Sequence, residues 1–248
     1  MVNYKDKIAE KYKKILFIHG WGFTNKIWNN ISDYFYLENC IFLDLYTYIE
    51  KSNGDLRLVA SRVLDDHKDI DLVLSWSLGC YLAKEIEFIA KLKSIKMVYI
   101  SYAPKFIRTN KWKFGFEENT IAKLRKDLED DKEKALKNFY LLILGDLRGK
   151  KIFYKDIVNN NNSIMDVSLE NLNIGLDIIE KNNYNDIYKE NSSNLYIYGD
   201  KDDITSSGVA NFIKELEPLS IIKVIPDSSH IPFLTNRDEF FKIIKEFI

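Results

Sequence analysis

The chain has 248 residues, of which 46% are hydrophobic and 29% charged, and its 36 basic and 37 acidic side chains leave a formal net charge of −1. This length is typical of one sizeable domain, or of one domain with an insertion, whose core forms without disulfides or metal ions. A charge balance near zero argues against a dedicated nucleic-acid-binding protein, so we expect no nucleic-acid partner.

The N-terminal segment carries lysines without the apolar stretch of about seven residues that follows them in a secretory signal. No run of about 18 apolar residues occurs in the chain, which argues against a membrane span. Cys40 and Cys80 are the only cysteines, and no Cys and His residues have the spacing of zinc ligands. We expect free thiols, no metal or cofactor, no membrane partner and a cytoplasmic location.

Short β-branched runs alternate with amphipathic stretches, a pattern typical of βα units that form a parallel sheet. The expected strands are Ile15–Ile18, Ile41–Leu45, Leu72–Leu74, Met97–Ser101, Leu195–Tyr198 and Ile221–Ile225. The expected helices are Asn25–Phe35, Leu56–Asp66, Leu78–Ala90, Ser206–Leu216 and Arg237–Phe247. The sequence therefore predicts an α/β fold with an open, mostly parallel central sheet that is flanked by helices.

This alternation stops in the middle of the chain, where long charged helical patterns such as Thr120–Leu144 replace it. We interpret residues 105–189 as a helical insertion. Residues 1–104 and 190–248 then form the α/β core that the insertion interrupts.

Two asparagine-rich stretches, Asn159–Asn162 and Asn191–Asn194, are expected to be loops or linkers, since Asn side chains compete with regular backbone hydrogen bonds. Lysine accounts for 30 of the 36 basic residues, and asparagine is used heavily throughout. Clusters of either residue are therefore weak evidence of function.

A serine in the stretch Ser75-Trp-Ser-Leu-Gly79 follows a buried type of strand and precedes a helical pattern. Small residues two positions before and after this serine, Ser77, allow the sharp strand–turn–helix of a nucleophile elbow, which exposes the serine Oγ. Ser75 replaces the usual glycine, so the motif alone also fits a serine near an ordinary helix N-terminus. We predict Ser77 as a nucleophile.

A serine nucleophile needs a general base, and the chain has only three histidines, His19, His67 and His230. His67 lies in a charged helix end, and His19 ends the first expected strand. His230 lies in the loop between the last expected strand and the last helix, and such loops carry the sites of α/β enzymes. We predict His230 as the base.

The base in turn needs an acid that holds its tautomer. Three candidates, Asp200, Asp202 and Asp203, follow the strand that ends at Tyr198. In the hydrolase pattern Gly-x-x-Asp the acid stands three residues after the glycine, which selects Asp202. The chain order Ser, Asp, His is that of α/β-hydrolases.

Acyl transfer also needs N–H donors directed at the oxyanion. The glycines of His19-Gly-Trp-Gly22 allow the backbone N–H of Trp21 to face Ser77, and a second donor is the N–H of Leu78 at the start of the next helix. His19 then either braces this loop or is an ordinary histidine at a strand end.

Taken together, HGWG at 19–22, SWSLG at 75–79, GDKDD at 199–203 and SSHIPF at 228–233 resemble the α/β-hydrolases over nearly the whole chain. The stretches FIHGWGFTNKIW, SYAP and LNIGLDI resemble most closely the family of pimeloyl-acyl-carrier-protein methyl ester esterases of biotin synthesis. This resemblance implies a helical lid above the serine and hydrolysis of the methyl ester of a carrier-bound pimeloyl chain. The sequence departs from the family at Asp44-Leu-Tyr-Thr-Tyr48, where a glycine-rich turn is usual, so we expect a different pocket wall there.

A lid above Ser77 makes Phe139, Tyr140 and Leu142, together with Trp21, candidates for the lining of an acyl tunnel, although helix packing needs the same apolar residues. An acidic carrier protein would favour basic side chains at the mouth of that tunnel, and Lys134, Arg148 and Lys151 are the candidates. Acidic residues are also frequent in this helix, so a solvated charged surface remains the competing interpretation.

The favoured function is a serine carboxylesterase that acts on a small linear acyl ester, with the ester on an acyl-carrier protein as the sharpest version. A thioesterase or a carbon–carbon bond hydrolase stays open, because a triad does not determine which bond is cleaved. The alternative from another class is a non-catalytic binding protein of the same fold. Such proteins have usually lost one of the triad residues.

Overall fold

In the part of the chain that the computed structural model describes, six parallel strands form the central sheet, in the order β2-β1-β3-β4-β5-β6. The strands are β1 (Ile15–Ile18), β2 (Cys40–Leu43), β3 (Leu72–Trp76), β4 (Lys96–Ile100), β5 (Leu195–Gly199) and β6 (Ile221–Ile225). The structure describes residues 14–90, 95–117, 119–183, 193–205 and 207–248. The chain moves outward from β1 to β2 and then returns to β3, so the crevice beyond the carboxyl ends of β1 and β3 is a switch point where α/β proteins bind ligands.

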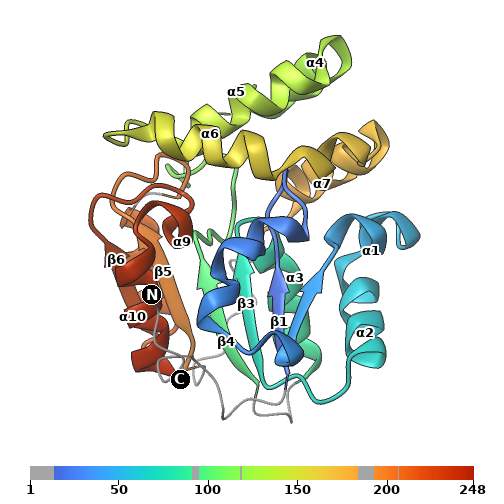
Figure 1. Cartoon of the computed structure of the whole chain (residues 1–248). Helices are drawn as coiled ribbons and strands as arrows, with labels where there is room; N and C mark the ends of the chain where they lie inside the picture. Colours follow the sequence, from blue (N-terminus) through green and yellow to red (C-terminus); the bar gives the residue numbers. More distant parts are fainter. Residues whose placement is uncertain (1–13, 91–94, 118, 184–192, 206) are drawn as a thin grey trace.

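Helices cover both faces of the sheet (Figure 1). One face carries α2 (Leu56–Asp66), α3 (Gly79–Ile89) and α8 (Ser207–Leu216), and the other carries η2 (Asn25–Tyr34), α9 (Pro232–Thr235) and α10 (Arg237–Phe247). Two short helices, η3 (Leu37–Asn39) and α1 (Leu45–Lys51), flank β2. The inner strands β1, β3 and β5 are buried along their whole length, which explains their continuous apolar sequence.

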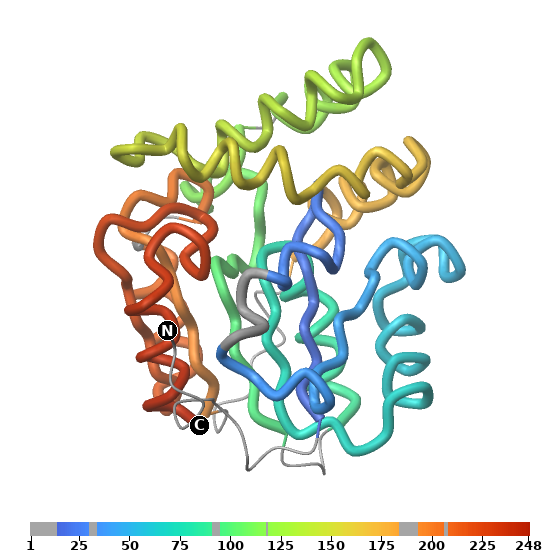
Figure 2. The backbone as a smooth tube through the Cα atoms, viewed as in Figure 1, coloured from blue at the N-terminus to red at the C-terminus, as the bar shows by residue number. Residues whose placement is uncertain are grey.

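The remaining helices lie together across the carboxyl ends of the strands (Figures 1 and 2). They are α4 (Thr120–Asp130), α5 (Lys132–Leu144), α6 (Lys150–Asn160), η4 (Asn162–Asp166) and α7 (Leu169–Lys181), and we call them the lid helices. The described residues between 105 and 183 add no strand to the sheet. Their only β-type pairings are the isolated bridges Ile107–Phe116 and Thr109–Trp112. The division into residues 1–104 with 190–248 and residues 105–189 stays a prediction, since it includes residues outside the described part.

Several element boundaries differ from the sequence-based prediction. The long helical pattern Thr120–Leu144 is broken at Asp131, whose extended backbone ends α4 and whose carboxylate caps α5 by accepting from the Lys134 N–H. Leu45 begins α1 instead of ending a strand. The stretch Asn159–Asn162 is not a loop throughout, because its first two residues end α6 and its last begins η4. The predicted loop Asn191–Asn194 lies partly outside the described residues.

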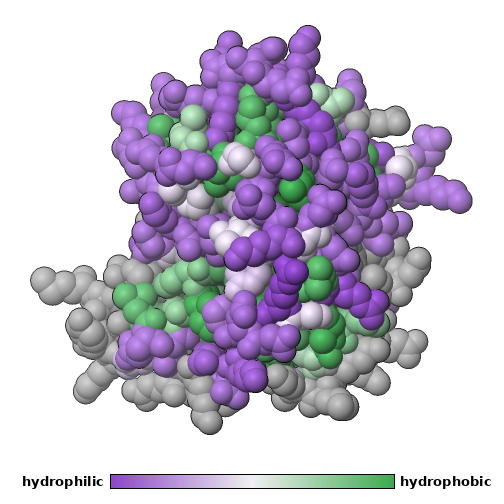
Figure 3. Space-filling view, turned by 90° about the vertical axis from the view of Figure 1, so that its right-hand side faces the viewer, coloured by the Kyte–Doolittle hydropathy of each residue, from purple (hydrophilic) through white to green (hydrophobic). Residues whose placement is uncertain are grey.

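The surface turned toward the viewer in Figure 3 is mainly hydrophilic, and its hydrophobic side chains form small separate areas. None of the helices that the structure describes has both the length and the apolar composition needed to cross a membrane.

Candidate active site

Ser77 occupies the sharp turn between β3 and α3, with a φ of 53° in the left-handed region. Its backbone N–H donates to the carbonyl of Ile100 at 2.9 Å. A Cβ at Gly79 would lie 2.6 Å from the His19 carbonyl oxygen, so this position requires glycine. The Ser75 hydroxyl, where the usual motif has glycine, donates to the Val98 carbonyl of β4 at 3.1 Å. Serine is therefore accommodated without an unpaired polar group.

Three predicted residues form one hydrogen-bonded chain. The Ser77 Oγ lies 2.9 Å from Nε2 of His230, and Nδ1 of His230 lies 2.8 Å from Oδ2 of Asp202. Ser77 is half-buried, whereas His230 and Asp202 are buried. In this arrangement a carboxylate holds the proton on Nδ1 and leaves Nε2 free to accept a proton from the serine.

The carboxylate of Asp202 is fixed by its own loop. Its Oδ1 accepts from the N–H groups of Ile204 and Thr205 at 2.8 and 2.9 Å, and the Thr205 hydroxyl donates to Oδ2. Burial by itself would raise the pKa of Asp202, but the charge and hydrogen bond of His230 and the hydrogen bonds from Thr205 outweigh it and lower the pKa. The carboxylate therefore stays ionised beside the imidazole.

The backbone of His230 is held from three sides. Its carbonyl accepts from the Trp76 indole at 2.7 Å and from the Ser101 hydroxyl at 2.9 Å. Its N–H donates to the carbonyl of Ile143 in lid helix α5 at 3.2 Å. Trp76 and Ser101 thus position the histidine, a role that sequence reasoning did not assign to either residue.

The other candidates lie apart from this chain of contacts. His67 ends α2, and its Nε2 lies 3.4 Å from the Tyr48 hydroxyl. Asp200 accepts from the Ser228 N–H at 3.2 Å, and Asp203 is exposed. Burial raises the pKa of the Cys80 thiol to about 12, so this neighbour of Ser77 stays protonated.

The loop after β1 carries the first predicted oxyanion donor. The His19 Nδ1–H donates to the carbonyl of Gly20 at 2.9 Å, and its Nε2 accepts from the Leu45 N–H at 3.0 Å. The Gly20 carbonyl belongs to the same peptide as the Trp21 N–H, so His19 orients that peptide. Within the described residues neither the Trp21 N–H nor the Leu78 N–H has a hydrogen-bond partner, and both remain available to a substrate oxygen.

Tyr46 supplies a contact that the sequence did not reveal. This residue lies in the stretch that departs from the resembled family, at the start of α1. Its buried hydroxyl accepts from the N–H of Gly22 at 2.8 Å, and burial raises the pKa of Tyr46. The tyrosine thereby holds the peptide that follows Trp21.

The lid helices contact this loop through predicted residues and one unpredicted glycine. The Trp21 indole donates to the Leu172 carbonyl of α7 at 2.9 Å and packs edge-to-face on Phe139, with 4.7 Å between ring centroids. A Cβ at Gly175 would lie 2.7 Å from the indole, which explains the glycine in the α7 motif. The Tyr140 hydroxyl donates to the Gly22 carbonyl at 3.2 Å.

Two groups of predicted lid residues point outward. Leu142 is 42% exposed, so the structure does not bring it to the loop after β1 as it brings Phe139 to Trp21 and Tyr140 to Gly22. Lys134, Arg148 and Lys151 are exposed, and no ion-pair partner for them is found among the described residues.

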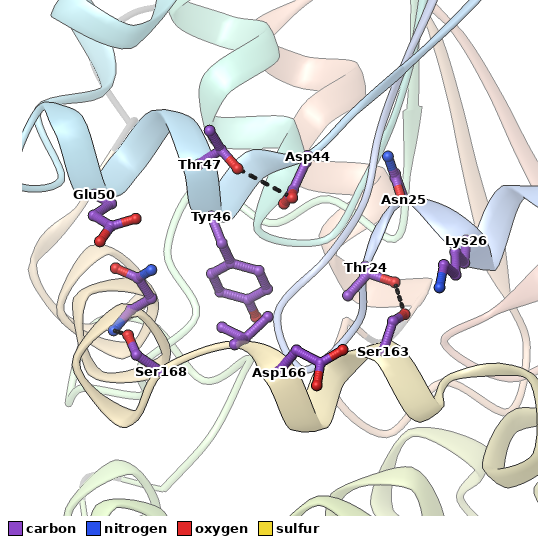
Figure 4. A pocket seen from close by; sticks show the side chains of 12 residues that line it. Thr24, Asn25, Lys26, Asp44, Tyr46, Thr47, Glu50, Ser163, Asp166 and Ser168 are labelled. Atoms are coloured by element: carbon purple, nitrogen blue, oxygen red, sulfur yellow. Dashed lines mark hydrogen bonds between the residues drawn. The ribbon is translucent and has the colours of Figure 1, made fainter.

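A pocket of about 440 Å³ lies where the loop after β1, α1 and the lid helices meet (Figure 4). Polar side chains line most of it, among them Thr24, Asp44, Tyr46, Ser163 and Asp166. Ser77 is not part of this lining, so the pocket lies beside the candidate active site and does not open onto the serine. Within the described residues no group of three or more His, Cys, Asp and Glu side chains is arranged to hold a metal ion.

Comparison with known proteins identifies the fold and finds similar sequences. No protein-family model matches the chain. The fold matches the structure of an esterase (EaEST) from Exiguobacterium antarcticum with a TM-score of 0.80 over 95% of this chain and 91% of that one, at 18% identity. The fold is that of the α/β-hydrolases.

The sequence is similar to proteins named pimeloyl-(acyl-carrier protein) methyl ester esterase. It is 26% identical over 241 residues to that of Vibrio parahaemolyticus, with 94% of this chain and 93% of the relative covered. It is 28% identical over 252 residues to that of Wigglesworthia glossinidia brevipalpis, with the same coverage of 94% and 93%.

Proposed function

We propose that the protein is a serine carboxylesterase whose substrate is a linear acyl ester, namely the methyl ester of pimeloyl-acyl-carrier protein in biotin synthesis. The observation that carries the proposal is the hydrogen-bonded chain from Ser77 through His230 to Asp202 at an elbow of an α/β-hydrolase fold. The similarity to esterases of that name, over nearly the whole of both chains, supports the choice of ester and carrier.

In the first half of the reaction, the Ser77 Oγ attacks the ester carbonyl while Nε2 of His230 takes its proton. The resulting oxyanion accepts hydrogen bonds from the N–H groups of Trp21 and Leu78. Collapse of this intermediate breaks the bond to the alkoxy oxygen, and the imidazolium returns the proton, so that methanol leaves.

In the second half, water attacks the acyl-serine and His230 removes one of its protons. The carboxylic acid is released, and the Ser77 hydroxyl recovers its proton from the imidazolium. Asp202 remains ionised through both halves, because its role is to stabilise the imidazolium and to hold its orientation.

The carrier-protein part of the proposal rests on charge at the surface of the lid helices. Several neighbouring lysines are already paired: Lys137 contacts Glu133, and Lys132 donates to two backbone carbonyls of residues 165–167. Lys134, Arg148 and Lys151 are left to meet the acidic surface of a carrier. Phe139 beside Trp21 and Tyr140 beside Gly22 would contact the acyl chain, and Leu142 would lie nearer the surface.

The test is a series of methyl esters, from short acyl chains to pimeloyl esters on a carrier protein, compared between wild type and Ser77→Ala. We expect turnover with the wild type, the highest kcat/KM for the carrier-bound ester, and loss of both turnover and phosphonate labelling in Ser77→Ala. Labelling that persists in the variant would show that the nucleophile is another residue. Turnover of thioesters but not of oxygen esters would contradict the carboxylesterase assignment.

A further inference from the structure

The side chain of Asn161 is buried where the lid helices meet the loop after β1. It stands between α6 and η4, in a run of four asparagines of which Asn159, Asn160 and Asn162 are exposed and Asn161 is 3% exposed. A single buried amide within an otherwise solvated run indicates a specific set of partners, since an unpaired buried amide would be costly.

All polar atoms of this amide are used by one short stretch of backbone and one tyrosine. Its Nδ2 donates to the Gly22 carbonyl at 3.0 Å and to the Tyr140 hydroxyl at 2.7 Å. Its Oδ1 accepts from the Thr24 N–H at 3.4 Å. Tyr140 itself donates to the same Gly22 carbonyl. Asn161 therefore links the lid to the backbone at both ends of residues 22–24.

Contacts from other segments of the chain hold the backbone of residues 22–24. Gly22 has a φ of 74°, and a Cβ there would lie 3.1 Å from the Phe139 ring, so this position favours glycine. A glycine has no side chain that could anchor the backbone. Beyond Thr24 the pocket of Figure 4 opens, and the Thr24 hydroxyl bridges to Ser163 of η4 at 2.7 Å. The lid contacts hold the segment on one side, and Tyr46 of α1, which also lines the pocket, accepts from the Gly22 N–H.

We propose that Asn161 is a positioning residue for the oxyanion donor: it fixes Gly22 and Thr24, and thereby holds the neighbouring Trp21 N–H in the orientation that binds the oxyanion. This inference rests on the proposed function. It makes the donor's placement depend on the lid, so seating of the lid helices is coupled to the reactivity of Ser77.

The test compares Asn161→Asp with the matched control Asn162→Asp, which introduces the same charge at the exposed neighbour. Asp at 161 keeps an acceptor for Thr24 but loses both donated hydrogen bonds. For a small ester such as p-nitrophenyl butyrate, we expect kcat to fall roughly 10- to 100-fold with a much smaller change in KM, because a displaced donor weakens transition-state binding. Phosphonate labelling of Ser77 should slow in parallel, and the control should match the wild type.

Tyr140→Phe provides a second, independent test, because it removes the other side-chain hydrogen bond to the Gly22 carbonyl. This variant tests the inference even if Asn161→Asp does not fold. We expect a decrease in kcat of several-fold, and in the double variant less than the product of the single effects, since both residues hold one carbonyl. Unchanged kcat and labelling rate in folded variants, even with a lowered Tm, would overturn the inference and leave the esterase proposal standing. A wild type that neither hydrolyses esters nor reacts with the phosphonate would overturn both.

Discussion

Two largely buried groups of polar side chains adjoin helix α3, and they differ in where they lie relative to the carboxyl ends of the strands. The first is the chain Ser77–His230–Asp202, which ends at a half-buried hydroxyl beyond the carboxyl ends of the strands. The second lies on the α3 face of the sheet, and we call it the Lys84 cluster. It comprises Lys84, Glu87, Tyr99, Asn194, Tyr196, Glu217 and Ser220.

Among the described residues, the members of the Lys84 cluster make hydrogen bonds mainly with one another. Lys84 Nζ donates to Glu217 at 2.8 Å, to Glu87 at 3.1 Å and to the Tyr196 hydroxyl at 2.7 Å. Asn194 donates 3.0 Å bonds to both carboxylates, which offsets the surplus of negative charge. Both groups obey the rule that buried polar atoms must be paired. The difference indicates that the Lys84 cluster, on the helix-covered face of the sheet, serves stability, while a network that ends beyond the carboxyl ends of the strands can do chemistry.

Among the substitutions that test this difference, we expect the largest loss of activity at Asp202. Asp202→Asn removes the charge that holds the His230 tautomer, and we expect kcat for an ester to fall by about 10⁴ with little change in Tm. Asp203→Asn is the matched control, since Asp203 is exposed and should leave kcat unchanged. Equal losses of kcat in the two variants would mean that catalysis does not depend on the carboxylate of Asp202.

Lys84→Met should have the opposite profile. The variant leaves the buried Glu217 and the half-buried Glu87 without their cation, so we expect the free energy of unfolding to fall by about 3 to 5 kcal/mol. Because no reacting atom contacts Lys84, kcat per folded molecule should stay near that of the wild type. Lys123→Met, which breaks the exposed Lys123–Asp127 pair, is the control and should cost less than about 1 kcal/mol. Denaturant titration measures the free energy of unfolding of both variants. Equal losses would contradict a special stabilising role of the Lys84 cluster.

Acid should weaken the Lys84 cluster in a defined range. Burial would raise the pKa of Glu87, but the Lys84 charge and the hydrogen bonds from Asn194, Tyr99 and Lys84 lower it from 4.5 to about 2. A depressed folded pKa contributes stability above the unfolded pKa, here on the order of 3 kcal/mol, and this is lost as pH falls from about 4.5 to about 2. Unfolding measured across this range should be less pH-dependent in Lys84→Met. The same slope in both proteins would count against Lys84 as the cause.

The smallest effect is expected at the surface of the lid helices. Reversal of Lys134, Arg148 and Lys151 to Glu should raise KM several-fold for a carrier-bound ester and reduce the dependence of KM on salt, because it removes attraction to an acidic partner. KM for p-nitrophenyl butyrate should not change. If both substrates respond alike, these charges do not form a docking surface.

The α/β pattern and the candidates Ser77, His230 and Asp202 could be predicted from the sequence, because these predictions depend on local rules. An elbow needs small residues at fixed offsets, and three histidines leave few choices for a base. The structure brings the three side chains within hydrogen-bonding distance, although their catalytic roles stay predictions. The start of α1 and the break at Asp131 were missed, since a short helix and a single extended residue leave weak periodic signals.

Which polar residues support the site and which support the fold became visible only in three dimensions. Asn161 contacts Gly22 across 139 residues, and Lys84 contacts Glu217 across 133. In the sequence these residues belong to abundant types, and nothing local separates Asn161 from the exposed asparagines beside it. Burial separates them, because a buried amide or ammonium group must find partners wherever the fold supplies them, and that supply is set by packing between distant segments.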